Sequence, residues 1–361
     1  MRVAMFMLLT KKNAATRAFG YQFAPRFRAA GVPTDVYPPS PVWIFELLCE
    51  GRRLARLRKA LYWYGIVLPA RIWQIARAWR CDVIFIQRGM FRYDARPVLE
   101  SLLCFVARRL HSARVVYHLD DALYLHADPR HIQRRIAMAD VVLSGNSDII
   151  AYARSWNANV TMFEGALDLS YYRPAEPRDG EAVVIGWAGT DPANVADMPA
   201  VMTRLPRDLD VRFRIVGPES AGSVRGLRVE YRRWSLEREF DDLRSFDIGV
   251  MPLPDTPYHR AKEGFKLKQY MAAGIPVVAS PVGVNTLLVQ DGDNGFFAST
   301  EQEWADKLTL LACDRDLRRR MGAAGRRLVE ERYSLDDAAP KLLEILRGEP
   351  VAGTGAEEAA A

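Results

Sequence analysis

The chain has 361 residues, of which 49% are hydrophobic and 26% charged. This composition is that of a soluble globular protein and excludes a disordered, collagen-like or disulfide-scaffold chain. At roughly 150 residues per domain, the length predicts about two domains. The net charge of +6 divides unevenly: residues 1–180 carry 26 Lys and Arg against 15 Asp and Glu (+11), and residues 181–361 carry 24 against 29 (−5). The two halves are therefore expected to face different partners.

The four cysteines show no paired spacing, which fits a reducing compartment and predicts a cytoplasmic protein. The longest apolar stretch, residues 61–70, is far shorter than the roughly 18 residues that span a bilayer. The opening residues 1–9 resemble a short signal peptide. However, Lys11 and Lys12 follow directly and no small-residue cleavage site is present, so a buried first strand is expected instead.

In chain order, short β-rich runs alternate with helical stretches, and the rhythm occurs twice. In the first half, strands are expected at residues 3–9, 82–87, 114–118, 141–144 and 160–163, with helices at 16–30, 97–111 and 129–139. In the second half, strands are expected at residues 183–187, 211–216, 227–231, 247–251 and 276–280, with a helix at 262–273. This order predicts an α/β protein of two doubly wound, Rossmann-like domains in tandem.

A stretch rich in proline and charge at residues 172–177 is the expected linker. We therefore expect an N-terminal domain over 1–172, a C-terminal domain over 173–334, a closing helix over 335–348 and a disordered tail over 349–361. Ligands of such sheets bind beyond the carboxyl ends of the strands. Two such domains facing each other predict an active site in the cleft between them.

Several kinds of site are not indicated. Neither half opens with Gly-x-Gly-x-x-Gly, and no Gly-x-x-x-x-Gly-Lys-Ser/Thr loop is present, so neither a nicotinamide enzyme nor a P-loop enzyme is predicted. The cysteine and histidine spacings do not match a zinc site, and no metal site is expected.

The segment from Pro254 to Ser280 carries the most information. At about 100° per residue, a helix over 262–273 would place Lys262, Lys266 and Gln269 in one narrow arc and leave the opposite side for the core. Unpaired N–H groups, the helix dipole and two ammonium groups would all favour a diphosphate at the start of this helix. Gln269 is then a candidate for ribose hydroxyls. The alternative is an ordinary solvated basic face.

The motifs in this region resemble those of a known family. The run 266–283, with Asp291–Phe296 behind it, is similar to the donor-site signature of family 4 glycosyltransferases, the glycosyl transferases group 1 type, which have the GT-B fold. Further similarity covers nearly the whole chain, at residues 116–123, 185–190, 246–253 and 315–334. The resemblance implies transfer of a sugar from a nucleotide-diphosphate donor to an acceptor. It also implies no obligatory metal or other cofactor and, usually, retention of the anomeric configuration.

The chain departs from the family pattern at the donor site. Many relatives carry two glutamates eight residues apart, at the positions of Ala261 and Gln269, and an Arg and a Lys near Trp187. The resemblance therefore implies a diphosphate site at Lys262 and Lys266, where cations stabilise the leaving group. The remaining donor-binding candidates are Gln269 for the ribose, Gly189 and Thr190 over the phosphates, Glu263 in place of the missing glutamate, Phe265, and Trp234, which lies where the family holds the base or else belongs to the core.

The acceptor candidates lie in the first half. The strand over 114–118 delivers His118, Asp120 and Asp121 to its carboxyl end, where a carboxylate can orient an acceptor hydroxyl or accept its proton. Asp121 is favoured over His118 as the catalytic group. The alternative is that one aspartate caps the next helix. Arg17, after the first strand, is expected either to bind a phosphate of the acceptor or donor, or to be an ordinary surface residue.

Residues 51–80 contain many arginines and aromatic residues and no acidic residue. This pattern suits an anionic membrane surface, where each nearby cation contributes about 1 kcal/mol. The alternatives are core packing of the aromatics and nucleic-acid binding, and the fold resemblance argues against nucleic acid.

The overall prediction is a glycosyltransferase of cell-envelope polysaccharide or glycolipid synthesis. It would act on a glycan or lipid-linked acceptor in the cytoplasm, at the inner face of the plasma membrane. Two alternatives remain open: a sugar-nucleotide epimerase of the same fold, and a non-catalytic sugar-nucleotide-binding partner protein.

Overall fold

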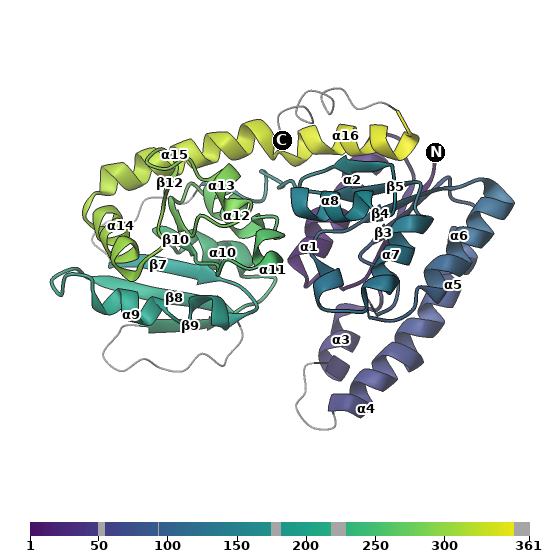
Figure 1. Ribbon diagram of the computed structural model, residues 1–361, viewed down its shortest axis with the longest axis horizontal. Helices are drawn as coiled ribbons and strands as arrows, with labels where there is room; N and C mark the ends of the chain where they lie inside the picture. The colour runs from purple at the N-terminus through teal and green to yellow at the C-terminus, as the bar shows by residue number, and fades with distance from the viewer. Residues whose placement is uncertain (50–54, 93, 175–181, 218–228, 350–361) are drawn as a thin grey trace. The chain divides into compact units, whose positions relative to one another are not determined.

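The structure is a computed structural model that describes residues 1–49, 55–92, 94–174, 182–217 and 229–349. These residues form two compact units (Figure 1). Met1–Ala166 and the chain from Leu335 onward form the N-unit, and Leu167–Ser334 form the C-unit. Within the described residues, no helix is both long enough and apolar enough to cross a membrane.

The N-unit is built on a parallel sheet. The described strands lie in the order β2-β1-β3-β4-β5-β6. All residues of β1 and β3 are buried, as expected for a parallel sheet covered on both faces. The strands are β1 (Val3–Met7), β2 (Thr34–Tyr37), β3 (Val83–Gln87), β4 (Arg114–His118), β5 (Val141–Ser144) and β6 (Val160–Met162).

The helices of the N-unit connect and cover these strands. The segments α4, η2 and α5 continue into one another as one long helical rod (Figure 1). The helix α16 packs against α2, and Arg26 Nε lies 2.8 Å from Asp336 Oδ1 at this contact. The helical segments are α1 (Ala14–Thr16), η1 (Arg17–Tyr21), α2 (Phe23–Ala29), α3 (Val42–Cys49), α4 (Ala55–Ala60), η2 (Leu61–Val67), α5 (Leu68–Ala78), α6 (Val98–His111), η3 (Leu123–Leu125), α7 (Pro129–Met138), α8 (Ser147–Arg154) and α16 (Leu335–Arg347).

The C-unit has a second parallel sheet, in the order β12-β11-β10-β7-β8-β9. Buried apolar residues form one core cluster that includes α12 and another that includes α9 and α14. Its strands are β7 (Val183–Ala188), β8 (Val211–Gly217), β9 (Val229–Arg233), β10 (Ile248–Met251), β11 (Val277–Ala279) and β12 (Gly295–Phe297). Its helices are η4 (Pro192–Val195), α9 (Met198–Thr203), α10 (Glu239–Arg244), α11 (Pro257–Arg260), α12 (Phe265–Ala272), α13 (Asn285–Leu288), α14 (Glu301–Cys313) and α15 (Arg315–Arg332).

The predicted helix over residues 262–273 is wrong at its start. The structure has two helices here, α11 and α12, separated by residues 261–264. Gly264 takes a left-handed conformation, with φ of 63°, and a Cβ at this position would lie 2.5 Å from Leu288 Cδ1. The glycine therefore turns the chain where α13 packs against it. Lys262 consequently lies in a loop, outside the helix that carries Lys266.

The division of the chain differs from the predicted boundary after residue 172. Leu167 N–H donates to the carbonyl oxygen of Tyr333, at 2.8 Å, and the Tyr172 side chain is buried in the C-unit. These contacts attach residues 167–172 to the C-unit. The predicted closing helix is present as α16 and belongs to the N-unit, while residues 350–361 of the predicted tail lie outside the described residues.

One buried cation joins the carboxyl ends of neighbouring N-unit strands. The Arg71 side chain on α5 is fully buried. It donates to the carbonyl oxygens of Met7 at the end of β1, Tyr37 at the end of β2 (2.9 Å) and Met90 after β3 (2.5 Å). Burial lowers the pKa of Arg71 to about 10, and Glu100 opposes this effect. Arg71, one of the arginines of residues 51–80, is therefore not available to a membrane surface.

Candidate functional site

One arginine and two aspartates meet at the carboxyl ends of β3 and β4. Arg88 follows β3 with φ of 62°, a left-handed conformation that is uncommon outside glycine. Its Nε and Nη2 lie 2.7 Å from the two carboxylate oxygens of Asp120, and Nη2 lies 2.5 Å from Asp121 Oδ2. The unusual backbone directs one guanidinium onto both carboxylates.

The two aspartates differ in exposure. The Asp120 side chain is 3% exposed and that of Asp121 is 17% exposed. Burial alone would raise the pKa of Asp120, but the charge and hydrogen bonds of Arg88 hold that pKa below its ordinary value. Asp120 is thus an anion fixed beneath the surface, whereas a ligand can reach Asp121.

The alternative that one of these aspartates caps the next helix is wrong. The N-cap of η3 is Ala122, which makes no side-chain cap, and α7 is capped by Asp128, which accepts from the N–H of Arg130. Both carboxylates at the end of β4 are instead held by Arg88. The geometry therefore leaves the ligand-binding interpretation of Asp121 in place.

His118 lies in the interior beside this cluster. Its ring has no exposed surface and packs between Phe19 and Phe85, with centroid distances of 4.0 and 6.0 Å. Among the described residues, neither ring nitrogen has a hydrogen-bond partner. Burial lowers the pKa of His118 to about 4, although Asp120 acts in the opposite direction. The imidazole is therefore neutral near pH 7 and is not open to an acceptor in this structure.

Arg17 lies in η1, close to the end of β1. Its Nη1 donates to the carbonyl oxygens of Lys11 and Lys12, both at 2.9 Å. The guanidinium therefore holds the loop after β1, and its predicted contact with a phosphate stays a prediction. The neighbouring Thr16 connects this loop to the aspartates, because its hydroxyl lies 3.3 Å from Gln87 Oε1 and Gln87 Nε2 lies 3.3 Å from Asp120.

In the C-unit, both predicted diphosphate lysines rest on aromatic rings. Lys262 Nζ is 3.9 Å from the centroid of the Tyr258 ring and donates to its hydroxyl at 2.8 Å. Lys266 Nζ is 4.7 Å from the centroid of the buried Trp187 ring. Lys262 reaches this region from the loop before α12 and Lys266 from its first turn, so the two ammonium groups do not form the predicted helical stripe.

Gly189 lies directly under Lys266 at the carboxyl end of β7. A Cβ at Gly189 would lie 2.6 Å from Lys266 Nζ and even closer to the Trp187 ring. The structure therefore brings Gly189 and Lys266 together, as predicted from the sequence. The Gly189 N–H already donates to the carbonyl oxygen of Val216, at 2.9 Å, so this amide is not free to bind a phosphate. Thr190, which follows, is exposed.

The other donor candidates are held by C-unit contacts. Gln269 is buried, and its Nε2 donates to the Tyr172 hydroxyl at 2.8 Å. Trp234 packs partly against the core and donates from Nε1 to Glu239 Oε1 at 3.2 Å. Glu263 is buried next to Gly264, and Phe265 packs partly against the same core. The ribose, base and sugar contacts assigned to these residues stay predictions.

His259, which is not among the residues predicted from the sequence, joins the loops around Lys262 and Lys266. His259 in α11 has Nδ1 at 2.8 Å from Thr256 Oγ1 and Nε2 at 3.2 Å from Asn194 Oδ1 in η4. The imidazole therefore links the loop after β7 to the loop after β10. A sequence signal was present, since a Thr-Pro helix start places His259 three residues before Lys262.

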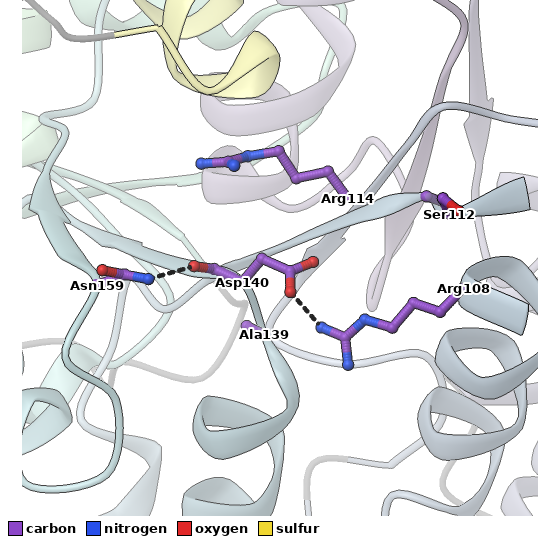
Figure 2. A pocket seen from close by; sticks show the side chains of 7 residues that line it. Arg108, Ser112, Arg114, Ala139, Asp140 and Asn159 are labelled. Carbon is purple, nitrogen blue, oxygen red and sulfur yellow. Dashed lines mark hydrogen bonds and ion pairs between the residues drawn. The ribbon is translucent and has the colours of Figure 1, made fainter.

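A separate cavity lies at the amino-terminal edge of the N-unit sheet. It has a volume of about 530 Å³ and is lined by residues that include Arg108, Arg114, Asp140 and Asn159. Figure 2 shows Arg108 paired with Asp140, at 2.6 Å, while Arg114 points away from that pair. This edge is opposite to the one that carries Arg88 and the aspartates, so the cavity is not part of the candidate site.

Comparisons with known proteins agree with the sequence motifs. Residues 192–314 match the family model described as glycosyl transferases group 1. A D-inositol 3-phosphate glycosyltransferase of Xylanimonas cellulosilytica is 31% identical over 172 residues, which are 47% of this chain and 36% of the relative. A GDP-mannose-dependent α-(1-6)-phosphatidylinositol monomannoside mannosyltransferase of Mycobacterium tuberculosis is 35% identical over 91 residues, 25% of this chain and 24% of the relative. The matched regions span about a third or less of the length of these relatives. The predicted resemblance to glycosyl transferases group 1 is confirmed.

Solved structures share the fold of nearly the whole chain. HepE of Anabaena, solved in complex with UDP and glucose, has a TM-score of 0.67 at 16% identity and covers 96% of this chain and 100% of its own. Sucrose-phosphate synthase of Thermosynechococcus elongatus has a TM-score of 0.69 at 15% identity, with 100% of both chains covered. At these identities the likeness concerns the fold, and the predicted GT-B fold is confirmed.

The burial of His118 predicts a pH dependence of stability. In the unfolded chain, His118 takes up a proton as the pH falls through its ordinary pKa, whereas in the folded chain it takes one up only near the lowered pKa. The unfolded chain therefore binds more protons between these two values, and the free energy of unfolding falls as the pH falls through this interval. From about pH 7 to about pH 5, we expect the wild type to lose about 2 kcal/mol more unfolding free energy than His118→Phe. Urea unfolding at both pH values measures this difference.

The exposed His126 provides the matched control. His126→Phe should lose the same unfolding free energy as the wild type over this pH range. Equal losses in the wild type and in His118→Phe would show that His118 titrates normally in the folded chain.

Proposed function

We propose that this chain, whose residues 192–314 belong to glycosyl transferases group 1, is a retaining glycosyltransferase. It transfers a sugar from a nucleotide-diphosphate donor to a glycan or lipid-linked acceptor, in cell-envelope polysaccharide or glycolipid synthesis at the cytoplasmic face of the membrane. The observation that carries the proposal is the Lys266 ammonium group, which lies over Trp187 at the carboxyl end of β7. Lys262 lies in the loop region after β10, which His259 joins to the loop after β7. In doubly wound sheets, this edge is where ligands bind.

The donor chemistry follows from these cations. When the bond between the sugar and the diphosphate breaks, negative charge grows on the leaving diphosphate. Fixed ammonium groups stabilise that charge, because they need not reorganise as the reaction proceeds. Lys266 is held over the Trp187 ring and against Gly189, and Lys262 is held by Tyr258. We propose that the two lysines supply the charge compensation that a divalent metal supplies in other transferases, so that no metal is obligatory.

The acceptor chemistry is assigned to Asp121. Its carboxylate is the more exposed member of the Asp120–Asp121 pair, and Arg88 fixes its direction. In this position Asp121 accepts a hydrogen bond from the acceptor hydroxyl and orients it for attack. Asp120 and Arg88 are positioning residues, because both lie largely beneath the surface.

The membrane proposal rests on exposed side chains of the N-unit. The rod from α4 to α5 buries Tyr62, Val67 and Ile75 and leaves the basic side chains of Arg56, Lys59 and Arg77 exposed, and Arg80, just after α5, is exposed as well. The aromatics of this stretch therefore divide between the core and the surface. Large apolar side chains that are more than half exposed on this rod and on the nearby α3 are Trp43, Leu47, Leu57, Leu61, Tyr64, Ile72 and Trp73. Apolar anchors interleaved with cations suit an anionic lipid surface.

Replacement of Lys266 tests the donor site. Lys266→Ala should lower the transfer rate about 10²–10³-fold, because one fixed charge on the leaving group is lost. The melting temperature should stay near that of the wild type. Lys341→Ala, an exposed lysine of α16, is the control and should keep full activity. Assays with donor and acceptor, and with donor alone, separate transfer from hydrolysis and epimerisation. Undiminished transfer in Lys266→Ala would exclude the proposed diphosphate contact.

Replacement of Asp121 tests the acceptor site. Asp121→Asn should lower transfer about 10²-fold or more, because the amide no longer accepts or orients the hydroxyl proton as a carboxylate does. The dissociation constant for the nucleoside diphosphate should stay unchanged. Asp148→Asn, an exposed aspartate of α8, is the control. If Asp121→Asn transfers sugar at the wild-type rate, the acceptor assignment is wrong.

Vesicle sedimentation tests the membrane surface. The wild type should bind vesicles containing anionic lipid and bind them less as salt rises. The double variant Tyr64→Ser/Trp73→Ser should bind these vesicles with an affinity at least about tenfold lower, because two apolar anchors are lost. Leu287→Ser removes an apolar side chain of the C-unit that is at least as exposed, and this variant should bind vesicles as the wild type does. No binding of the wild type at low salt would exclude this membrane role.

A further inference from the structure

The hydrogen bonds of His259 determine which of its nitrogens carries the proton. Asn194 donates from Nδ2 to the carbonyl oxygen of Asp191, at 3.2 Å, so its Oδ1 is the atom that faces His259 Nε2. An amide oxygen only accepts, and Nε2 must therefore carry a proton. On the other side, Thr256 Oγ1 accepts the backbone N–H of His259, at 3.3 Å, and lies 2.8 Å from Nδ1. In the neutral ring, Nδ1 accepts the proton of the Thr256 hydroxyl.

This arrangement accommodates a second proton without moving any heavy atom. A proton added at Nδ1 would point at Thr256 Oγ1, which has a second lone pair to accept it once the hydroxyl rotates. Nε2 would continue to donate to Asn194. The imidazolium is thus as well hydrogen-bonded as the neutral ring, and its cost is set by charge and burial alone.

The charged groups that face His259 oppose protonation in the free protein. Burial comes first, and the positive charges of Lys262 and Lys266 add to it, so that the pKa of His259 lies below its ordinary value. Asp191, before η4, acts in the opposite direction. The Tyr258 ring, 5.5 Å from the imidazole, is the neutral neighbour on the same helix. The same two lysines that form the proposed diphosphate site therefore act together with burial to disfavour the imidazolium in the free protein.

We propose that binding of the donor diphosphate draws one proton from solvent onto Nδ1 of His259, so that an imidazolium joins Lys262 and Lys266 as a third cation. This inference rests on the proposed function, since it requires the diphosphate to bind beside these lysines. The diphosphate of a nucleotide sugar carries two negative charges, which reverse the local field that His259 experiences. The donor and the proton then bind cooperatively, and each raises the affinity for the other by the same factor.

The sign of the pH effect follows from this coupling. The pKa of His259 is higher in the complex than in the free protein, so protons are taken up on binding at pH values between the two. Donor affinity therefore falls as the pH rises through this interval, by up to about tenfold per pH unit. The imidazolium also places one more cation next to the diphosphate when it leaves.

Isothermal titration calorimetry tests the proposal with UDP-glucose and GDP-mannose as probes. Their diphosphates are diesters and do not titrate near neutral pH, so the ligand itself contributes no proton there. Titrations in two buffers of different ionisation enthalpy, between about pH 6 and about pH 8, give the number of protons taken up. The wild type should take up a substantial fraction of one proton, and His259→Gln should take up none and bind with nearly constant affinity. His126→Gln, at an exposed histidine, should behave as the wild type.

The possible outcomes separate this inference from the function on which it rests. Equal proton uptake by the wild type and His259→Gln would overturn the role of His259 and leave the proposed donor site intact. Binding of neither probe to the wild type would overturn the proposed donor site and this inference with it. A second measurement needs no substitution. The imidazole NMR signals of the wild type, titrated with and without the bound probe, should show one histidine whose pKa rises on binding, and unchanged titration curves for all five histidines would refute the proposal.

Discussion

Lys266 reaches the carboxyl end of β7 across the face of a buried tryptophan, and this approach leaves no room for side chains around it. The Trp187 ring has no exposed surface, and Gly189 must lack a Cβ for the ammonium to lie where it does. Gly217 obeys the same constraint, because a Cβ there would lie 2.5 Å from the carbonyl oxygen of Gly189. One crowded point at the ends of β7 and β8 thus fixes the cation, and Lys262 is placed separately by its own aromatic ring.

The N-unit achieves the same rigidity with buried charges. The Arg135 and Glu100 side chains are each 1% exposed, and Arg135 Nε lies 2.9 Å from Glu100 Oε1. The same oxygen accepts the N–H of Met90 at 3.0 Å, while Arg71 binds the carbonyl oxygen of Met90. A buried ion pair often contributes little to net stability. Here the buried side chains of Glu100 and Arg71 hydrogen-bond to the backbone of Met90, two residues after Arg88. These bonds help to hold Arg88 in the left-handed conformation from which its side chain reaches the two aspartates.

The sequence predicts the tandem fold well because its central strands are continuous apolar runs, and it fails where local patterns are weak or tertiary contacts decide. The strand Thr34–Tyr37 was not predicted, since it is a short edge strand with a polar half. The spacing of apolar residues predicted one helix over 262–273, whereas the structure begins α12 only after Gly264. A left-handed residue does not change the spacing of apolar residues, so the spacing could not indicate this break. Arg71 belongs to the arginine-rich stretch over 51–80 that was expected to suit a membrane surface, although its partners are buried carbonyl groups that composition does not reveal. Lys266 came from helical spacing together with the resemblance and Gly189 from the resemblance alone, whereas His259 required the geometry of two separate loops.

The assignment of α16 to the N-unit makes that unit discontinuous along the chain. The sheet of the N-unit ends with β6, yet the helix that packs on α2 arrives only after the whole C-unit. During synthesis, all segments of the C-unit are made before α16, the last segment of the N-unit. The N-unit is therefore begun first and completed last. The face of α2 that packs against α16 stays uncovered until α16 has been synthesised.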